Sequence, residues 1–225
     1  KLRMKRGDAL RRIDRSVRAA AREGATIQFS AEDATRADRV FLRQCVDTAV
    51  CAGAVRINVP DTVGFAAPEE YGEMVGEIVR FVGDGVIVSA HCHDDLGLAT
   101  ANSIAAVRNG ARQVEVAVNG IGERAGNAAL EEVAAVLEAK SIADTGVRLA
   151  DVQTLSRCVA EETGVAVAPN HPVVGEHAFA HSSGIHQDGI LKHRATYQFL
   201  APESVGAGDH RFVFTARSGR SAVAH

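Results

Sequence analysis

The sequence has few cysteines, no long apolar run and no excess charge of one sign. The four cysteines, Cys45, Cys51, Cys92 and Cys158, show no Cys-x-x-Cys spacing, so we expect neither a disulfide framework nor a thiolate zinc cluster. No apolar run approaches the ~20 residues of a membrane span, and Lys1–Arg6 lacks the apolar stretch of a signal peptide. These absences favour a reducing cytoplasm.

Charge is spread evenly along the chain. The 25 basic and 28 acidic residues give a net charge of −3, which leaves no electrostatic footprint for nucleic acid or an anionic membrane. The basic segment at residues 1–22 carries Leu10, Ile13 and Val17 at helical spacing, as a solvated helix does. With 46% hydrophobic residues in 225, the chain can build one sizeable core, as one domain or one domain with an appendage.

Helical and strand patterns alternate from Asp8 to about Gly126, which is typical of successive βα units around a parallel sheet. The predicted helices are 8–23, 38–52, 68–82, 98–108 and 128–139, and the predicted strands are 26–30, 54–59, 86–90 and 113–118. No Gly-x-Gly-x-x-Gly follows the first strand, so the units resemble half of a (β/α)8 barrel rather than a dinucleotide-binding sheet. Beyond residue 139 the alternation stops, and we expect a helix at 151–163 and a smaller subdomain.

Distinctive polar residues follow every predicted strand, at the end where barrels carry their chemistry. The segments are Ser30–Asp33, Asn58–Thr62, His91–His93 and Asn119–Asn127. Because His91 and His93 are two apart on a strand, they share a face and can offer two imidazole nitrogens to one metal ion, while Cys92 points away. Taken alone, this pair fits two structural histidines equally well. The placement of distinctive polar residues at all four strand ends predicts an active site.

These motifs, in this order, resemble those of the 2-isopropylmalate synthase family, metal-dependent Claisen-condensing and lyase enzymes that include homocitrate and citramalate synthases. The matching segments are Phe29–Ala34, Asn58–Gly64, His91–Gly97, Asn119–Asn127 and His181–Gly189. The resemblance implies that the four strands are the fifth to eighth of the family barrel. We therefore predict an α/β fold: the C-terminal half of a TIM (β/α)8 barrel in residues 1–145, then a small, mainly helical accessory subdomain in residues 146–225.

Members of the family that this sequence resembles contain two further parts that do not occur in the 225 residues. One is the first half-barrel, with an Asp-Gly-Glu-Gln motif that supplies an aspartate metal ligand and an arginine, and the other is a C-terminal regulatory domain that binds leucine. Thr215–Ala222 departs from the family's Gly-Lys-His-Ser-Gly-Arg-His-Ala run. We expect a fragment that is inactive or aggregates alone, because half a barrel exposes two unpaired sheet edges.

By the resemblance, His91, His93 and the side-chain oxygen of Asn127 bind a divalent metal ion together with the missing aspartate. Nitrogen and oxygen donors suit Zn, Mn, Mg or Co. The ion would polarise the carbonyl of a chelated α-keto acid. The alternative for Asn127 is the N-cap of a helix that begins at Ala128.

The resemblance implies further roles for seven residues: catalytic Glu32, His186 and Tyr197, and substrate-binding Ser30, Asn58, Thr62 and Glu123. Acetyl-CoA, the co-substrate, must lose a methyl proton to become a carbon nucleophile, which requires a base and an enolate stabiliser. His186 and Tyr197 would act in the neighbouring subunit's site, within a homodimer that exchanges subdomains.

Each of these residues also has a structural interpretation. Glu32 would be a solvated carboxylate near a helix start, and Thr62 would supply a turn hydroxyl. His186 and Tyr197 would form a buried polar network. Glu123 would form an ion pair with Arg124, or support the metal ligands from outside.

The implied reaction condenses acetyl-CoA with 2-oxoisovalerate (3-methyl-2-oxobutanoate) to give 2-isopropylmalate and CoA, in leucine biosynthesis. Another α-keto acid, as in homocitrate or citramalate synthases, is an alternative because a few methylenes change binding by only ~1–3 kcal/mol. A hypothesis from another class is a catalytically inactive fragment that acts as an assembly module. Small-molecule substrates are the expected partners, without nucleic acid or membrane.

Overall fold

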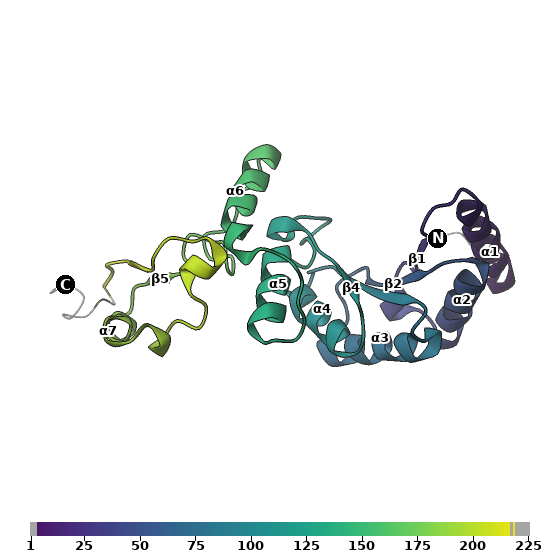
Figure 1. The fold of residues 1–225 in the computed structure, drawn as a ribbon, viewed down its shortest axis with the longest axis horizontal. Coiled ribbons are helices and arrows are strands. Elements are labelled where there is room, and N and C mark those ends of the chain that lie inside the picture. Colours follow the sequence, from purple (N-terminus) through teal and green to yellow (C-terminus); the bar gives the residue numbers. More distant parts are fainter. Residues whose placement is uncertain (1–3, 217, 219–225) are drawn as a thin grey trace. The chain divides into compact units, whose positions relative to one another are not determined.

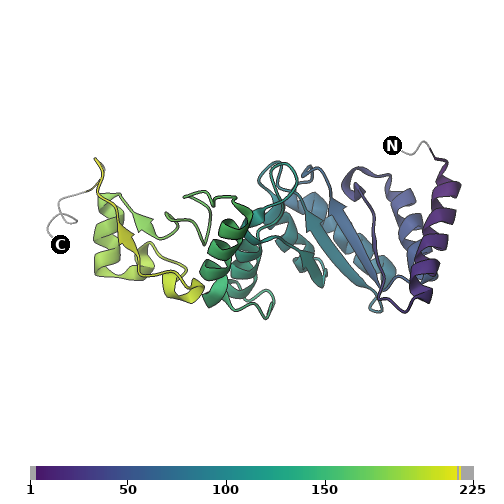
Figure 2. The same ribbon diagram turned by 90° about the horizontal axis from the view of Figure 1, so that it is seen from above.

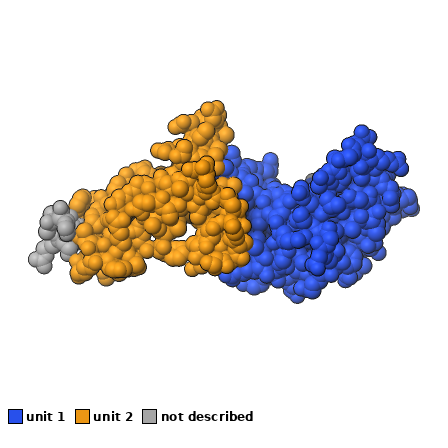
Figure 3. All heavy atoms as spheres, viewed as in Figure 1, with its two compact units in different colours: residues 1–129 blue, residues 130–225 orange. Residues whose placement is uncertain are grey.

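The computed structural model describes residues 4–216 and 218 (Figure 1). The chain divides into two compact units, residues 1–129 and 130–225, which Figure 3 colours separately. Helix α5 (Leu130–Ala139) belongs to the second unit, since it packs against the 3-10 turn Leu149–Asp151. The boundary between the two units, after residue 129, therefore lies sixteen residues before the domain boundary expected after residue 145.

The first unit is a parallel sheet with its connecting helices. The strands, in spatial order, are β1 (Gln28–Ser30), β2 (Arg56–Asp61), β3 (Ile87–Cys92) and β4 (Gln113–Glu115). The helices are α1 (Arg6–Arg22), α2 (Arg39–Ala52), α3 (Pro68–Val82) and α4 (Ala99–Arg108). Successive helices pack on one another, and α3 and α4 pack on β3. Figures 1 and 2 show the helices following one another beside the sheet.

The predicted elements are confirmed in kind and order, and their ends differ. β1 and β4 are shorter than predicted, because β1 pairs only with β2 and β4 only with β3 among the described residues. After Glu115 the chain turns into a 3-10 turn, Val118–Gly120. β2 and β3 extend two residues beyond the predicted ends, into Asp61 and Cys92, because hydrogen bonding continues past the apolar run.

Alternate residues give the sheet one apolar and one polar face. The apolar set is Phe29, Ile57, Val59, Val88, Ala90, Cys92 and Val114. On the other face the register pairs Ser30 with Asn58, Asn58 with Ser89, and Ser89 with Gln113. Parallel sheets are normally apolar on both faces. This polar face therefore marks the side of the sheet on which a function is to be sought.

Tyr71 on α3 bridges the two central strands where Pro60 is paired with His91. Its buried hydroxyl donates to the Val59 carbonyl at 2.5 Å and accepts from the His91 N–H at 3.3 Å. Pro60 has no N–H to offer to the ladder. The tyrosine hydroxyl thus supplies a hydrogen-bonded link between β2 and β3 at the backbone of His91.

Asp61, fully buried at the end of β2, organises the loop that follows. Its Oδ1 accepts from the Phe65 N–H and Thr35 Oγ1, at 3.1 and 2.9 Å. Its Oδ2 accepts from the Ala66 N–H at 3.1 Å and Asn102 Nδ2 at 3.4 Å. A buried carboxylate is tolerated when hydrogen bonds satisfy it, as they do here. The loops after β1 and β2 are consequently joined.

The second unit combines helices with a small sheet that sequence analysis did not predict. It contains α5, α6 (Val152–Thr163), α7 (Gly184–Lys192), and the parallel strands β5 (Ala180–His181) and β6 (Arg211–Phe212), besides short 3-10 turns at Arg194–Thr196 and Pro202–Val205. Val152, Val174 and Val205 form its buried core. The buried carboxylate of Glu131 on α5 lies 2.8 Å from His171 Nε2, a contact that holds the segment before β5.

All four cysteines are free thiols, as the sequence predicts. Burial raises the pKa of the Cys92 thiol to about 12, so this cysteine stays protonated. Within the described ranges, no helix is long and apolar enough to cross a membrane.

Replacement of Tyr71 by phenylalanine is expected to lower the free energy of unfolding by about 1–3 kcal/mol, because the Val59 carbonyl and the His91 N–H lose their link. Tyr197→Phe is the matched control, since that residue is 38% exposed, and we expect a change below about 0.5 kcal/mol. Urea unfolding measures both values. Equal stability of the two variants would contradict the bridging role.

Candidate active site

The side chains of His91, His93 and Asn127 meet at the carboxyl end of β3. His91 Nε2 lies 3.2 Å from His93 Nε2 and 3.4 Å from Asn127 Nδ2. A half-turn of the Asn127 amide would exchange its oxygen and nitrogen. Two imidazole nitrogens and an amide oxygen around one point form a donor set that fits a divalent cation.

A cation site at this point would depend on an asparagine as its third donor. Among the residues that the structure describes, no group of three His, Cys, Asp or Glu side chains is arranged to hold a metal ion. Burial lowers the pKa of His93, and the nearby His91 and Arg124 lower it further. His93 is consequently held in the neutral form that can coordinate a metal.

Asn127 lies in a β-bridge with His93 and does not cap a helix. Helix α5 begins at Leu130, so the alternative role of Asn127, as the N-cap of a helix at Ala128, is wrong. Residues 119–127 instead form a tight loop in which glycine is required. A Cβ on Gly122 would overlap Asn127 Oδ1, and one on Gly126 would overlap the Gly120 carbonyl oxygen.

Arg124, which sequence analysis considered only beside Glu123, joins three strand-end loops. Its guanidinium donates two hydrogen bonds to the Asp95 carboxylate, at 2.7 and 2.9 Å, and one to the Thr62 carbonyl at 2.7 Å. These bonds keep the pKa of Asp95 below its ordinary value. The ion pair expected between Glu123 and Arg124 is thus replaced by one with Asp95, because the loop turns at Arg124, whose φ is 55°.

The proposed substrate-binding residues occupy the same edge of the sheet. The Asn58 amide donates to Ser30 Oγ at 3.2 Å, and Asn58 Oδ1 is buried without a partner. Thr62 Oγ1 accepts from the Asp33 N–H at 2.8 Å, which gives this hydroxyl the turn role considered above. Glu32 and Glu123 are exposed in the loops that follow β1 and β4.

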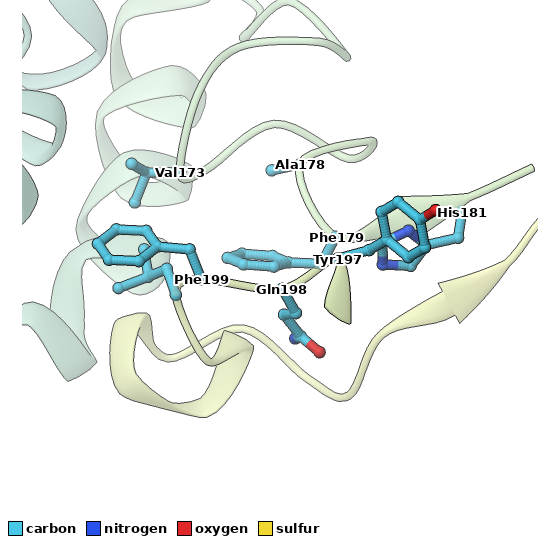
Figure 4. A pocket seen from close by; sticks show the side chains of 8 residues that line it. Val173, Ala178, Phe179, His181, Tyr197, Gln198 and Phe199 are labelled. Carbon is cyan, nitrogen blue, oxygen red and sulfur yellow. The ribbon is translucent and has the colours of Figure 1, made fainter. Parts of the chain in front are cut away.

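In the second unit, His186 and Tyr197 lie together. Their rings stack with centroids 4.1 Å apart and planes at 17°. Both side chains are exposed, so the pair does not form a buried network. Tyr197 and His181 line a pocket of about 210 Å³, and Figure 4 shows both at one end of it, with Val173 and Phe199 at the other.

Three histidines surround the strand pair β5–β6. The His181 ring centroid lies 6.3 Å from that of His186 and 6.3 Å from that of His210. Burial lowers the pKa of His181, and the two neighbouring imidazoles lower it further. Protonation of His181 is therefore less favourable in the folded state than in the unfolded chain.

Comparison with known proteins identifies the family. The model of the HMGL-like family matches residues 1–190, and the model described as homocitrate synthase post-HMGL domain-like matches residues 173–225. The chain belongs to the HMGL-like family. Of the segment Thr215–Ala222, noted above as a departure, residues 217 and 219–222 lie outside the described ranges.

Curated members of this family are about half identical to the chain. A 2-isopropylmalate synthase from Carboxydothermus hydrogenoformans is 49% identical over 228 residues, covering 99% of this chain and 45% of that protein. A 2-isopropylmalate synthase from Pyrococcus furiosus is 52% identical over 201 residues, covering 87% and 40%. The chain thus spans less than half the length of these relatives.

Solved structures share the fold at low sequence identity. Hydroxymethylglutaryl-CoA lyase from Pseudomonas aeruginosa matches with a TM-score of 0.62 at 20% identity, over 72% of this chain and 57% of that one. The carboxyl transferase domain of Rhizobium etli pyruvate carboxylase matches with a TM-score of 0.56 at 22% identity, over 64% and 25%. The predicted TIM-barrel βα architecture of an HMGL-like protein is therefore confirmed.

Replacement of Arg124 by lysine is expected to loosen the strand-end loops, because one ammonium cannot replace a guanidinium that binds Asp95 and Thr62 together. Amide hydrogen exchange of residues 62–66 and 119–127 should become about tenfold faster. Arg112→Lys is the control, since Arg112 has one exposed contact, with the Asp84 carbonyl. Unchanged exchange in the Arg124 variant would contradict the role.

Replacement of His181 by glutamine is expected to reduce the loss of stability in acid. Because the folded-state pKa of His181 is below 6.5, the unfolded chain binds its proton more tightly, and stability falls as pH falls through 6.5 toward the folded value. Thermal unfolding between about pH 8 and pH 5 measures the effect. The exposed His177→Gln is the control, and an equal acid loss in both variants would refute the expectation.

Proposed function

We propose that this protein is a 2-isopropylmalate synthase, which condenses acetyl-CoA with 2-oxoisovalerate to give 2-isopropylmalate and CoA in cytoplasmic leucine biosynthesis. The observation that carries the proposal is the meeting of His91, His93 and Asn127 beside Ser30 and Asn58, at the strand ends where barrel enzymes carry their chemistry. The relatives with this name, about 50% identical over 99% of the chain, support the choice of substrate.

A divalent cation, Zn, Mn, Mg or Co, would be held by His91 Nε2, His93 Nε2 and the Asn127 amide oxygen. When bound, it would supply Lewis-acid polarisation of the keto carbonyl. Ser30 Oγ, the unpartnered Asn58 Oδ1 and the Thr62 hydroxyl would bind and orient the polar atoms of the keto acid. Orientation of this kind is a main source of rate acceleration.

Glu32 is proposed as the carboxylate near the reacting carbon, at the strand end that carries Ser30. The methyl group of acetyl-CoA loses a proton, its carbon attacks the keto carbonyl, and the alkoxide that forms takes up a proton. Water then cleaves the thioester to give a carboxylate and CoA. His186 and Tyr197 of a second subunit would move these protons in a homodimer, and their stacking keeps an imidazole and a phenol together for that task.

A homocitrate-type synthase that uses another α-keto acid is the second candidate. The family model that matches residues 173–225 bears the name of homocitrate synthase and favours this candidate. That segment lies in the second unit, whereas Ser30, Asn58 and Thr62 lie in the first, so the keto acid itself must be tested directly.

The test measures release of free thiol from acetyl-CoA by the protein expressed from its complete gene, with a panel of short α-keto acids. We expect the highest kcat/KM with 2-oxoisovalerate, loss of activity after chelation and recovery on return of metal. His93→Gln should lower kcat/KM by at least the 10–100-fold that loss of a metal ligand's outer partner costs. His177→Gln, at an exposed histidine, should not change it.

Absence of thiol release with every keto acid, with and without added metal, would overturn the proposal. Preference for a keto acid other than 2-oxoisovalerate would select the second candidate. The same assay on residues 1–225 alone examines the alternative of an inactive assembly module, which predicts no turnover by this segment.

A further inference from the structure

Glu115 on β4, which has no role in the proposed reaction, is the centre of a polar cluster. Its Oε1 accepts from Gln28 Nε2 at 2.6 Å and lies 3.4 Å from Ser89 Oγ. Its Oε2 accepts from Asn58 Nδ2 at 3.2 Å and lies 3.0 Å from His91 Nδ1. A carboxylate has about four acceptor positions, and each here faces a polar group.

The contacts of Glu115 reach every strand of the sheet. Gln28 comes from β1, Asn58 from β2, and Ser89 and His91 from β3. Three of the four groups are amides or hydroxyls that can donate to a carboxylate with no change of protonation. His91 alone can present either a donor or an acceptor nitrogen, since a neutral imidazole has two tautomers.

We propose that Glu115 is a positioning residue that fixes the ring and the tautomer of His91. Glu115 Oε2 lies 3.0 Å from His91 Nδ1, and a carboxylate at this distance favours the tautomer in which Nδ1 carries the hydrogen. The angle of this contact lies outside the range of a hydrogen bond. The lone pair then belongs to Nε2, the nitrogen that faces His93 and Asn127. The role of Glu115 in metal binding rests on the proposed function, whereas its effect on the tautomer of His91 is independent of that function.

The same sheet face provides a matched control in Gln113. Its Nε2 donates to Gln28 Oε1 at 2.8 Å, so its side chain belongs to the polar cluster. Within the part of the chain that the structure describes, it forms no hydrogen bond with the side chain of Glu115 or His91. If Glu115 only joined strands, then Glu115→Ala and Gln113→Ala would have similar effects on His91. A positioning role predicts an effect from Glu115 alone.

The first experiment uses metal-free protein expressed from the complete gene and labelled with ¹⁵N-histidine. Nitrogen chemical shifts of His91 report which ring nitrogen carries the hydrogen. We expect the Nδ1–H tautomer in the wild type and in Gln113→Ala, and a shift toward Nε2–H in Glu115→Ala. An unchanged tautomer in Glu115→Ala, or an equal change in Gln113→Ala, would overturn the proposal.

The second experiment measures the dissociation constant for Co²⁺ by chelator competition and the visible spectrum of bound Co²⁺. Glu115→Gln keeps the side-chain shape and removes the charge, and we expect binding 10–100-fold weaker with an altered spectrum. Gln113→Ala should stay within about twofold of the wild type. If Glu115→Ala does not fold by circular dichroism, both readouts are taken on Glu115→Gln.

The two failures are distinguishable. Tight Co²⁺ binding by the wild type together with equally tight binding by Glu115→Gln overturns the positioning role and leaves the proposed function intact. A wild type that binds no Co²⁺, yet shows an Nδ1–H tautomer that depends on Glu115, supports the positioning of His91 and overturns the proposed metal-dependent function.

Discussion

The site in the first unit depends on the curvature of its sheet, which one contact between side chains of the two outer strands reveals. Gln28 on β1 and Glu115 on β4 are separated by two strands, yet their polar atoms lie 2.6 Å apart. In a flat sheet these strands would be about 14 Å apart, three spacings of roughly 4.8 Å. The two long side chains span part of this distance, and curvature of the sheet toward its polar face closes the rest, as in a barrel. The four strand ends converge on one small region as a result.

Convergence of the strand ends alone would leave the loops flexible. Three side chains, which are buried or form bidentate hydrogen bonds, fix these loops. Tyr71 links the strands at the His91 backbone, and Asp61 holds the loops after β1 and β2. Arg124 then ties the loop after β4 to Asp95 and to Thr62. Each link joins segments that are distant in sequence, so His91, His93 and Asn127 keep their mutual geometry through the scaffold rather than through their own contacts.

The sequence predicts the parts of this site that depend on local pattern. Alternating helical and strand patterns predicted the βα units, and the spacing of His91 and His93 predicted their shared face. The role of Glu115 and the pairing of Arg124 with Asp95 were not predicted, because both follow from strand register and curvature, which no local pattern specifies. One signal could have found Glu115: the polar residues at 113 and 115 alternate on a strand of a parallel sheet, where apolar residues are expected. The N-cap alternative for Asn127 arose because the helix start was placed two residues early.

The charges around the three converging side chains indicate what such a site can hold. His91, His93 and Asn127 are neutral donors, so they do not balance the charge of a divalent cation. Asp95 is already paired with Arg124, and Asp61 is satisfied by four hydrogen bonds. Glu115 faces His91 across the ring from Nε2 and can only act through it. A cation held here by these three side chains would therefore keep most of its positive charge, and further anionic groups, such as the aspartate that the family resemblance implies and a bound carboxylate, would supply the balance.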